Sequence, residues 1–182
     1  MNTIMPIYRG ICPHCGGDSR VDSIVNNGVC EKCMDRGEGV LRVYMDFVKG
    51  SEGEFEHFFE ELTGFKPWGA QRHWIRRILR GENTVLIAPT GVGKTTLLIV
   101  YAIYASMRGK RVLYVTPTKS LLAQTYSKIL TQAGRVGGGA DKVICYDSSR
   151  SRKSREVVLE KIKTCSYSLL VITNHFLLKN YG

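Results

Sequence analysis

The sequence lacks any run of 18 apolar residues, which is roughly the minimum length of a helix that crosses a bilayer. Its start, MNTIMPIYRG, is too short and too polar before the first cysteine to act as a secretory signal. We therefore expect a cytoplasmic protein without a membrane partner. Internal repeats and low-complexity tracts are also lacking. With 182 residues, 43% of them hydrophobic, the chain can form one domain, or a small module plus part of a larger domain.

Acidic residues are scarce in the last part of the chain. Residues 83–182 hold four Asp and Glu against fifteen Lys and Arg, whereas residues 1–40 hold five against four and residues 41–82 seven against seven. Because basic side chains displace condensed counterions from a phosphate backbone, this surplus predicts a polyanionic partner, most simply nucleic acid. A solvated basic surface without a partner is the alternative interpretation.

Four of the six cysteines lie in residues 1–40, with the spacing C-x₂-C-x₁₄-C-x₂-C. Each x₂ pair lets two sulfurs converge on one metal, so the pattern predicts a zinc-binding module. This segment lacks sustained apolar periodicity, and we expect the metal to supply most of its folding free energy. A pair of disulfides is the alternative, and His14 is a competing ligand in the first knuckle. The predicted zinc ligands are Cys12, Cys15, Cys30 and Cys33.

The apolar pattern after residue 50 predicts helices first and alternating strands and helices later. Phe55, Phe58, Phe59 and Leu62 share one helix face that ends at Gly64, and Pro67 opens a second helix. Beyond Asn83 the alternation is typical of an α/β fold with a parallel sheet. The predicted strands are 84–88, 111–116, 143–146 and 168–173, and the predicted helices between them are 96–108, 119–133 and 152–164.

The stretch APTGVGKT follows the first of these strands and precedes a helix, which is the context of a phosphate-binding loop. Its glycines let backbone N–H groups approach phosphate oxygens beside the positive end of the helix. Lys94 is expected to reach the β- and γ-phosphates of ATP, and the Thr95 hydroxyl to help hold Mg²⁺. An ordinary glycine turn before a helix is the alternative. The predicted loop comprises Ala88, Pro89, Thr90, Gly91, Val92, Gly93, Lys94 and Thr95.

The sequence pattern Ala-x-Thr-Gly-x-Gly-Lys-Thr resembles the phosphate loop of superfamily 2 helicases. Gln71, six residues after Phe65 and 23 before Lys94, resembles the Q-motif, in which a glutamine amide reads the adenine edge; the alternative is that it lines a helix face. The segments Pro117–Leu121 and Thr173–Leu177 look like motifs that contact the nucleic-acid backbone. Plain strand-to-helix turns are the alternative there, because Thr and Asn favour helix N-caps.

The order of these motifs, from the four cysteines through FKPWGAQRHW, APTGVGKTT and VTPTKSLLAQT to TNHFLLKN, closely resembles the N-terminal part of the reverse gyrase family. The resemblance implies a helicase-like half of two RecA-like domains, fused to a type IA topoisomerase, in which ATP drives positive supercoiling of DNA. It implies three parts here: a zinc-binding module at 1–40, a helical linker with the Q-motif at 41–82, and the first part of a RecA-like parallel sheet at 83–182. The implied partners are DNA and the remainder of the helicase-like and topoisomerase domains.

The sequence departs from the family at one point. The chain ends at Gly182, before the acidic Walker B strand that the family carries next. We therefore predict no catalytic residue in this segment and expect the chain alone not to hydrolyse ATP or pass strands. Two alternatives stay open: a non-catalytic zinc- and DNA-binding fragment, and another zinc-bearing superfamily 2 helicase that a partner completes.

Overall fold

The computed structural model describes residues 6–36, 40–137 and 139–180, and for residues 40–49 it describes the backbone alone. The chain divides into two compact units, Met1–Glu54 with Arg72–Thr84, and Phe55–Gln71 with Val85–Gly182. Within the described ranges, no helix is both long and apolar enough to cross a membrane.

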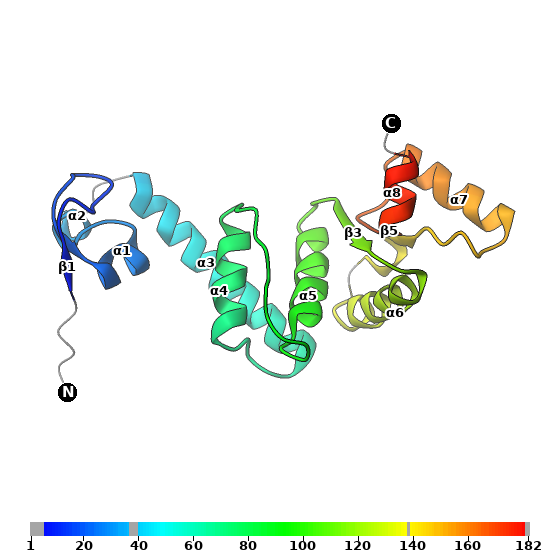
Figure 1. Ribbon diagram of the computed structural model, residues 1–182, viewed down its shortest axis with the longest axis horizontal. Coiled ribbons are helices and arrows are strands. Elements are labelled where there is room, and N and C mark those ends of the chain that lie inside the picture. Colours follow the sequence, from blue (N-terminus) through cyan, green and yellow to red (C-terminus); the bar gives the residue numbers. More distant parts are fainter. Residues whose placement is uncertain (1–5, 37–39, 138, 181–182) are drawn as a thin grey trace. The chain divides into compact units, whose positions relative to one another are not determined.

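The first unit begins with a small module of short strands and helices (Figure 1), and cysteines are among its buried residues. Strands β1 (Ile7–Tyr8) and β2 (Ser19–Arg20) pair antiparallel, and the short helices α1 (Val21–Asn27) and α2 (Glu31–Asp35) follow. Val29 is fully buried among Cys12, Cys30 and Cys33. This apolar cluster is small, as expected for a segment whose sequence lacks a long amphipathic element.

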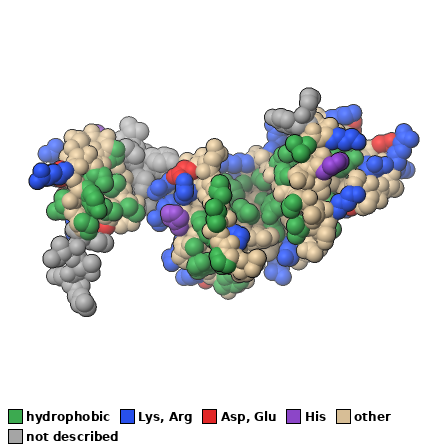
Figure 2. All heavy atoms as spheres, viewed as in Figure 1, with side chains coloured by type: hydrophobic (Ala, Val, Ile, Leu, Met, Phe, Trp, Pro, Cys, Tyr) green, Lys and Arg blue, Asp and Glu red, His purple; other side chains and the backbone are tan. Residues whose placement is uncertain are grey.

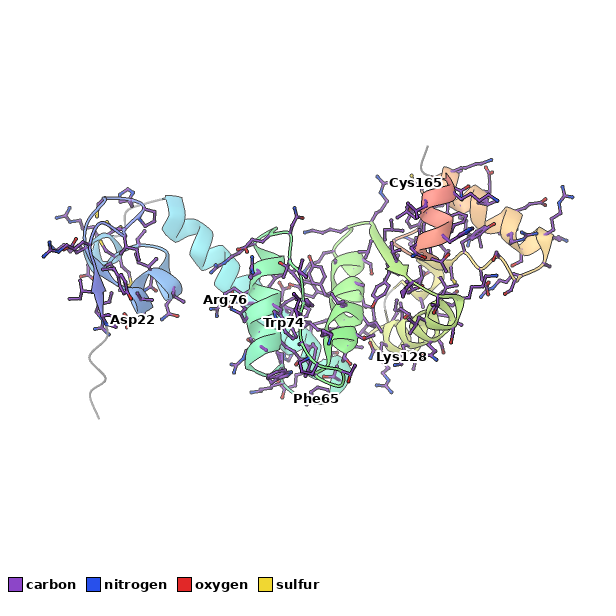
Figure 3. The ribbon with its side chains drawn as sticks, in the orientation of Figure 1. Asp22, Phe65, Trp74, Arg76, Lys128 and Cys165 are labelled. Carbon is purple, nitrogen blue, oxygen red and sulfur yellow. The ribbon has the colours of Figure 1, made fainter. Side chains whose placement is uncertain are left out.

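Two helices continue the chain and each contributes residues to both units. Helix α3 (Val40–Thr63) ends one residue before Gly64, as the sequence predicts, and α4 (Gly69–Leu79) starts shortly after Pro67. In the first unit Arg76 of α4 forms an ion pair of 2.8 Å with Glu52 of α3 (Figure 3). In the second unit the predicted aromatic face of α3 is buried at Phe55 and Phe59.

The second unit contains a three-stranded parallel sheet of order β3-β5-β4. Because the sheet is parallel and helices separate its strands, the predicted α/β fold is confirmed. The predicted strand and helix positions after residue 90 agree with the structure to within two residues. Its strands are β3 (Val112–Thr116), β4 (Val143–Cys145) and β5 (Leu169–Thr173). Its helices are α5 (Lys94–Met107), α6 (Lys119–Arg135), α7 (Arg152–Lys163) and α8 (Asn174–Asn180), with a 3₁₀ turn at Ala140–Lys142.

The central strand β5 separates two apolar clusters because successive strand residues point to opposite faces. Leu169 and Val171 join the main core, which includes residues of α3, α5 and α6. Leu170 and Ile172 join a second cluster with residues of α7 and α8. Both faces of β5 are therefore covered, as is usual for a strand in a parallel sheet.

The predicted strand at 84–88 is wrong. These residues form no strand in the described part of the chain, and Val85 and Ile87 are 80% and 89% exposed. A strand requires a neighbour that accepts and donates its ladder hydrogen bonds, and the apolar composition of a run does not supply that neighbour.

Candidate nucleotide and zinc sites

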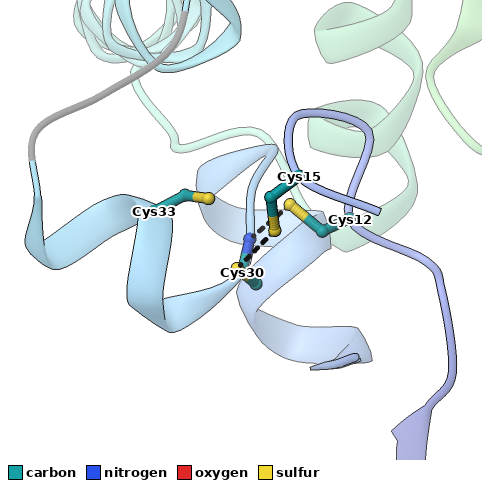
Figure 4. A group of neighbouring side chains, drawn as sticks. All are labelled: Cys12, Cys15, Cys30 and Cys33. Atoms are coloured by element: carbon teal, nitrogen blue, oxygen red, sulfur yellow. Dashed lines mark hydrogen bonds between the residues drawn. The ribbon is translucent and has the colours of Figure 1, made fainter. Parts of the chain in front are cut away.

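The four module cysteines converge in space, with all their sulfur atoms within 4.8 Å of one another (Figure 4). Four thiolates at about 2.3 Å from a tetrahedral zinc lie about 3.8 Å apart, so only a small contraction would close a metal shell. The Sγ atoms of Cys15 and Cys30 are 3.6 Å apart, and both cysteines are free. His14, the competing candidate, is exposed and does not belong to this group.

Backbone hydrogen bonds shape the first knuckle around its sulfurs. The Gly16 N–H donates to the Cys12 carbonyl at 2.9 Å, and the Cys12 N–H donates to the Gly17 carbonyl at 3.1 Å. Gly16 has a backbone φ of +66°, a value that residues other than glycine rarely adopt. A Cβ at Gly17 would lie 3.1 Å from the Cys15 Sγ. The turn therefore leaves room for sulfur where a larger residue would press on it.

The electrostatics of the cluster favour a bound cation. Burial disfavours a thiolate at Cys12, but N–H groups of Cys15, Cys30 and His14 stabilise it and lower its pKa to about 6. Burial and the neighbouring sulfurs raise the pKa of Cys33 to about 12. One thiolate thus forms readily, while a second beside it is opposed by burial and by the first charge. A divalent metal would remove this conflict, since soft thiolates are the ligands that zinc prefers in such knuckles.

The predicted phosphate loop leads directly into α5. Gly91 and Gly93 have φ values of +84° and +83°, so both positions need the conformational freedom of glycine. The Lys94 Nζ donates to the carbonyl oxygens of Ala88 and Pro89 at 2.5 and 2.6 Å. In this state the ammonium group lies on the carbonyls of the loop itself, and Thr95 is exposed beside it.

Gln71 is brought against the phosphate loop, although it lies 22 positions before Gly93 in the sequence. Its side chain is buried, and its Nε2 donates to the Gly93 carbonyl at 3.3 Å. Its Oε1 accepts the Trp68 N–H at 3.2 Å. A Cβ at Gly93 would lie only 2.5 Å from the Gln71 Nε2, so the close approach itself requires glycine. A primary amide has two N–H donors and two lone pairs, so these bonds leave capacity for a base edge.

Trp68 is a contact of the loop that the sequence patterns missed. Its indole Nε1 donates to the Val92 carbonyl at 3.2 Å. The only available signal was its place three residues before Gln71 in FKPWGAQRHW, and spacing alone does not show where an indole points. Phe65, the aromatic residue of the same predicted motif, packs edge-on against Phe59 with ring centroids 5.8 Å apart (Figure 3).

The two segments that resemble backbone-contacting motifs both form helix starts. The Thr118 side chain accepts the Leu121 N–H at 3.3 Å and caps α6. The Thr173 hydroxyl accepts the Phe176 N–H at 3.3 Å at the start of α8. The capping interpretation therefore describes these threonines, and the Oδ1 of Asn174, directly after Thr173, likewise accepts the His175 N–H at 2.8 Å. A pocket of about 340 Å³ lies between the two segments, with Lys119 and Phe176 in its lining.

Comparisons with known proteins agree with this geometry. The sequence model of the DEAD/DEAH box helicase family matches residues 68–181. A reverse gyrase from Pyrobaculum aerophilum is 34% identical over 200 residues, covering 100% of this chain and 16% of the relative. Reverse gyrase 2 from Aeropyrum pernix is 36% identical over 193 residues, covering 96% of this chain and 15% of the relative. The resemblance to reverse gyrases predicted from the motifs is thus confirmed, and the chain spans about a sixth of these relatives.

A solved structure is similar as well. The crystal structure of a hypothetical ATP-dependent RNA helicase from Sulfolobus tokodaii superposes with a TM-score of 0.52 at 28% identity. The match covers 71% of this chain and 36% of that one. It is consistent with the RecA-like character that the resemblance implies for the second unit.

Proposed function

Because the chain belongs to the DEAD/DEAH box helicase family, we propose that it forms the ATP-binding part of a reverse gyrase, in which ATP drives positive supercoiling of DNA. The observation that carries this proposal is the extent of the similarity. The helicase family matches from residue 68 onward, whereas the Pyrobaculum aerophilum reverse gyrase matches the whole chain, cysteine module included. This extent favours a reverse gyrase over other helicases of superfamily 2.

The loop before α5 is the proposed ATP site. Backbone N–H groups of the stretch Gly91–Lys94 would hold phosphate oxygens at the N-terminal end of α5. Lys94, which already lies within the loop, needs to exchange its two carbonyl partners for phosphate oxygens. The exposed Thr95 hydroxyl would help to hold Mg²⁺, and Gln71 would read the adenine edge. The bound nucleotide supplies the phosphoryl group whose transfer drives the motor.

The four-cysteine cluster is the proposed zinc site. Its donor set is all thiolate, three of its members are buried, and its sulfurs already lie close to tetrahedral spacing. The metal would act as a structural cross-link, since the apolar cluster around Val29 is small.

DNA is the proposed polyanionic partner, and the remaining helicase-like and topoisomerase domains are the proposed protein partners. The basic surplus of residues 83–182 supports the first assignment. Helix α7 shows how this charge is displayed: Arg152, Lys153, Arg155, Lys161 and Lys163 all lie on it. Lys and Arg side chains gather over this helix in Figure 2.

Nucleotide titrations of a Lys94→Ala variant test the ATP site. Hydrogen bonds to a charged group contribute about 1.5–3 kcal/mol, so we expect ATP and GTP to bind roughly 10- to 150-fold more weakly. Lys128→Ala, which removes an exposed lysine of α6 (Figure 3), is the matched control and should bind normally. Wild-type affinity in the Lys94 variant would contradict the assignment.

The assignment to a reverse gyrase is tested by the supercoiling of plasmid DNA. The complete gene product that carries this chain should convert relaxed plasmid to positively supercoiled topoisomers with ATP, and Lys94→Ala should abolish the conversion. ATP-dependent strand separation without supercoiling would favour the alternative of another zinc-bearing helicase. DNA binding without any ATP-dependent activity would favour the non-catalytic fragment.

A further inference from the structure

The 340 Å³ pocket of the second unit lies where α/β sheets usually bind ligands. It is lined by residues at the carboxyl ends of all three strands, among them Pro117 just after β3, Tyr146 just after β4 and Thr173, the last residue of β5. The helix after β3 joins one apolar cluster, while the helix after the neighbouring β5 joins the other. Two adjacent strands whose connections leave toward opposite faces open a crevice at their carboxyl ends, and ligands bind there.

The charges of this pocket favour an anion. Lys119, Arg155 and Lys179 line it, against the single carboxylate of Asp147. That carboxylate is already engaged, because the Ser149 N–H and hydroxyl donate to it at 2.9 and 2.7 Å. These two bonds hold the pKa of Asp147 below its usual range, so it remains a charged acceptor.

Arg155 gives a second and independent indication of a missing partner. Its Nε atom is buried and has no hydrogen-bond partner among the described residues. A buried guanidinium N–H without an acceptor is costly, and it is usually matched by a water, an ion or a ligand. Arg155 is one of the residues that line the pocket, so an acceptor oxygen bound there would lie beside this side chain.

The pocket also has an aromatic wall, which a site for a bare phosphate does not need. Tyr146 and Phe176 stack with ring centroids 3.9 Å apart and an interplanar angle of 29°, and both rings line the pocket while remaining partly exposed. Stacked rings beside cationic side chains are the combination that binds single-stranded nucleic acid, because every base offers a π-face and every nucleotide a phosphate. The volume lies within the range of roughly 300–1,000 Å³ typical of small-ligand pockets.

We propose that this pocket holds one unstacked nucleotide of single-stranded DNA, with its base against the Tyr146–Phe176 wall and its phosphate toward Lys119 and Arg155. The proposal rests on the proposed function in that DNA is the polyanionic partner. It adds a position that binds a DNA base to the contacts expected with the sugar-phosphate backbone of the DNA. A strand anchored at this position is held by its base as well as by its charge. Base contacts of this kind tolerate any sequence, as a motor that moves along DNA requires.

Binding of two matched oligonucleotides to the full chain tests the proposal. One is an ordinary single strand, and the other has the same number of phosphates but abasic sites in place of its bases. Phe176→Ala should weaken binding of the ordinary strand about 5- to 150-fold, the range for loss of one base–aromatic stack, and leave the abasic strand unchanged. Tyr167→Ala is the matched control: Tyr167 belongs to the same apolar cluster but lines a different pocket, near Lys110 and Lys142.

The base pocket would be overturned if Phe176→Ala and Tyr167→Ala lost the same affinity for the ordinary strand. It would also be overturned if the wild type bound the ordinary and the abasic strand equally well. In either case the protein would still bind the sugar-phosphate backbone of DNA, so DNA would remain the proposed partner. Absence of binding to either strand would overturn both proposals.

A second measurement avoids reliance on a variant that destabilises the apolar cluster. Strands that carry 5-iodouracil crosslink to aromatic side chains under ultraviolet light, and peptide mapping of the wild-type chain should place the crosslink at Tyr146 or Phe176. Crosslinks found only at aromatic residues outside the pocket would refute the proposal.

Discussion

Replacement of Gln71 by alanine tests the contact between the predicted adenine-reading residue and the phosphate loop. In the structure the amide joins two elements: it accepts the Trp68 N–H at 3.2 Å and donates to the Gly93 carbonyl at 3.3 Å. The side chain is only 2% exposed, so water cannot easily replace either bond. The variant should therefore reduce stability as well as nucleotide binding.

The expected loss of stability in Gln71→Ala follows from the two hydrogen bonds that it removes. Each neutral hydrogen bond contributes about 1 kcal/mol, so the variant should lose about 2 kcal/mol of unfolding free energy. For a chain of this size that corresponds to a decrease of roughly 4–8 °C in Tm. If the same amide also reads adenine through two further bonds, ATP should lose about 2 kcal/mol more than GTP, or roughly 30-fold in relative affinity.

Thermal unfolding and parallel ATP and GTP titrations measure these two effects separately. Gln71→Glu keeps an acceptor for the Trp68 N–H but places a buried carboxylate against the Gly93 carbonyl, so it should lower the unfolding free energy at least as much as Gln71→Ala. Gln124→Ala, at an exposed position of α6, should change stability by less than about 0.5 kcal/mol. An unchanged Tm in Gln71→Ala would refute the loop contact, and an unchanged preference for ATP over GTP would refute the adenine role.

Two further predictions concern the zinc cluster and the loop glycine. Cys30→Ser should lower the bound metal from about one zinc per chain to near zero and unfold the module, as measured by metal analysis and circular dichroism; full zinc content in the variant would contradict the assignment. Gly93→Ala should destabilise the chain by more than about 1 kcal/mol, because its φ is +83° and the new Cβ would lie 2.5 Å from the Gln71 Nε2. Gly53→Ala, with no atom within 4 Å of the added Cβ and no positive φ, is its control and should not lower Tm.

Local patterns in the sequence determined most of the helices and strands of this protein. The aromatic spacing at Phe55 and Phe59 and the Gly64 stop predicted where α3 ends, because a helix face and its termination depend on residues close in the chain. The short apolar runs at Val112–Thr116 and Leu169–Thr173 predicted two strands for the same reason. The paired x₂ spacings also predicted that four cysteines converge, since each pair is fixed within one turn.

The tertiary structure decided what depends on distant partners. The run at 84–88 has strand-like residues, yet pairing with a neighbour and not composition makes a strand, and no described strand pairs with it. The placement of Gln71 against Gly93 and of the Trp68 indole on Val92 required the short segment 68–71 to pack beside the loop within the second unit. The pocket of Lys119, Arg155 and Phe176 joins residues that follow three different strands. Sequence spacing carries no information on how residues from three strands meet in one pocket, because that depends on the order of strands in the sheet and on the faces to which their helices turn.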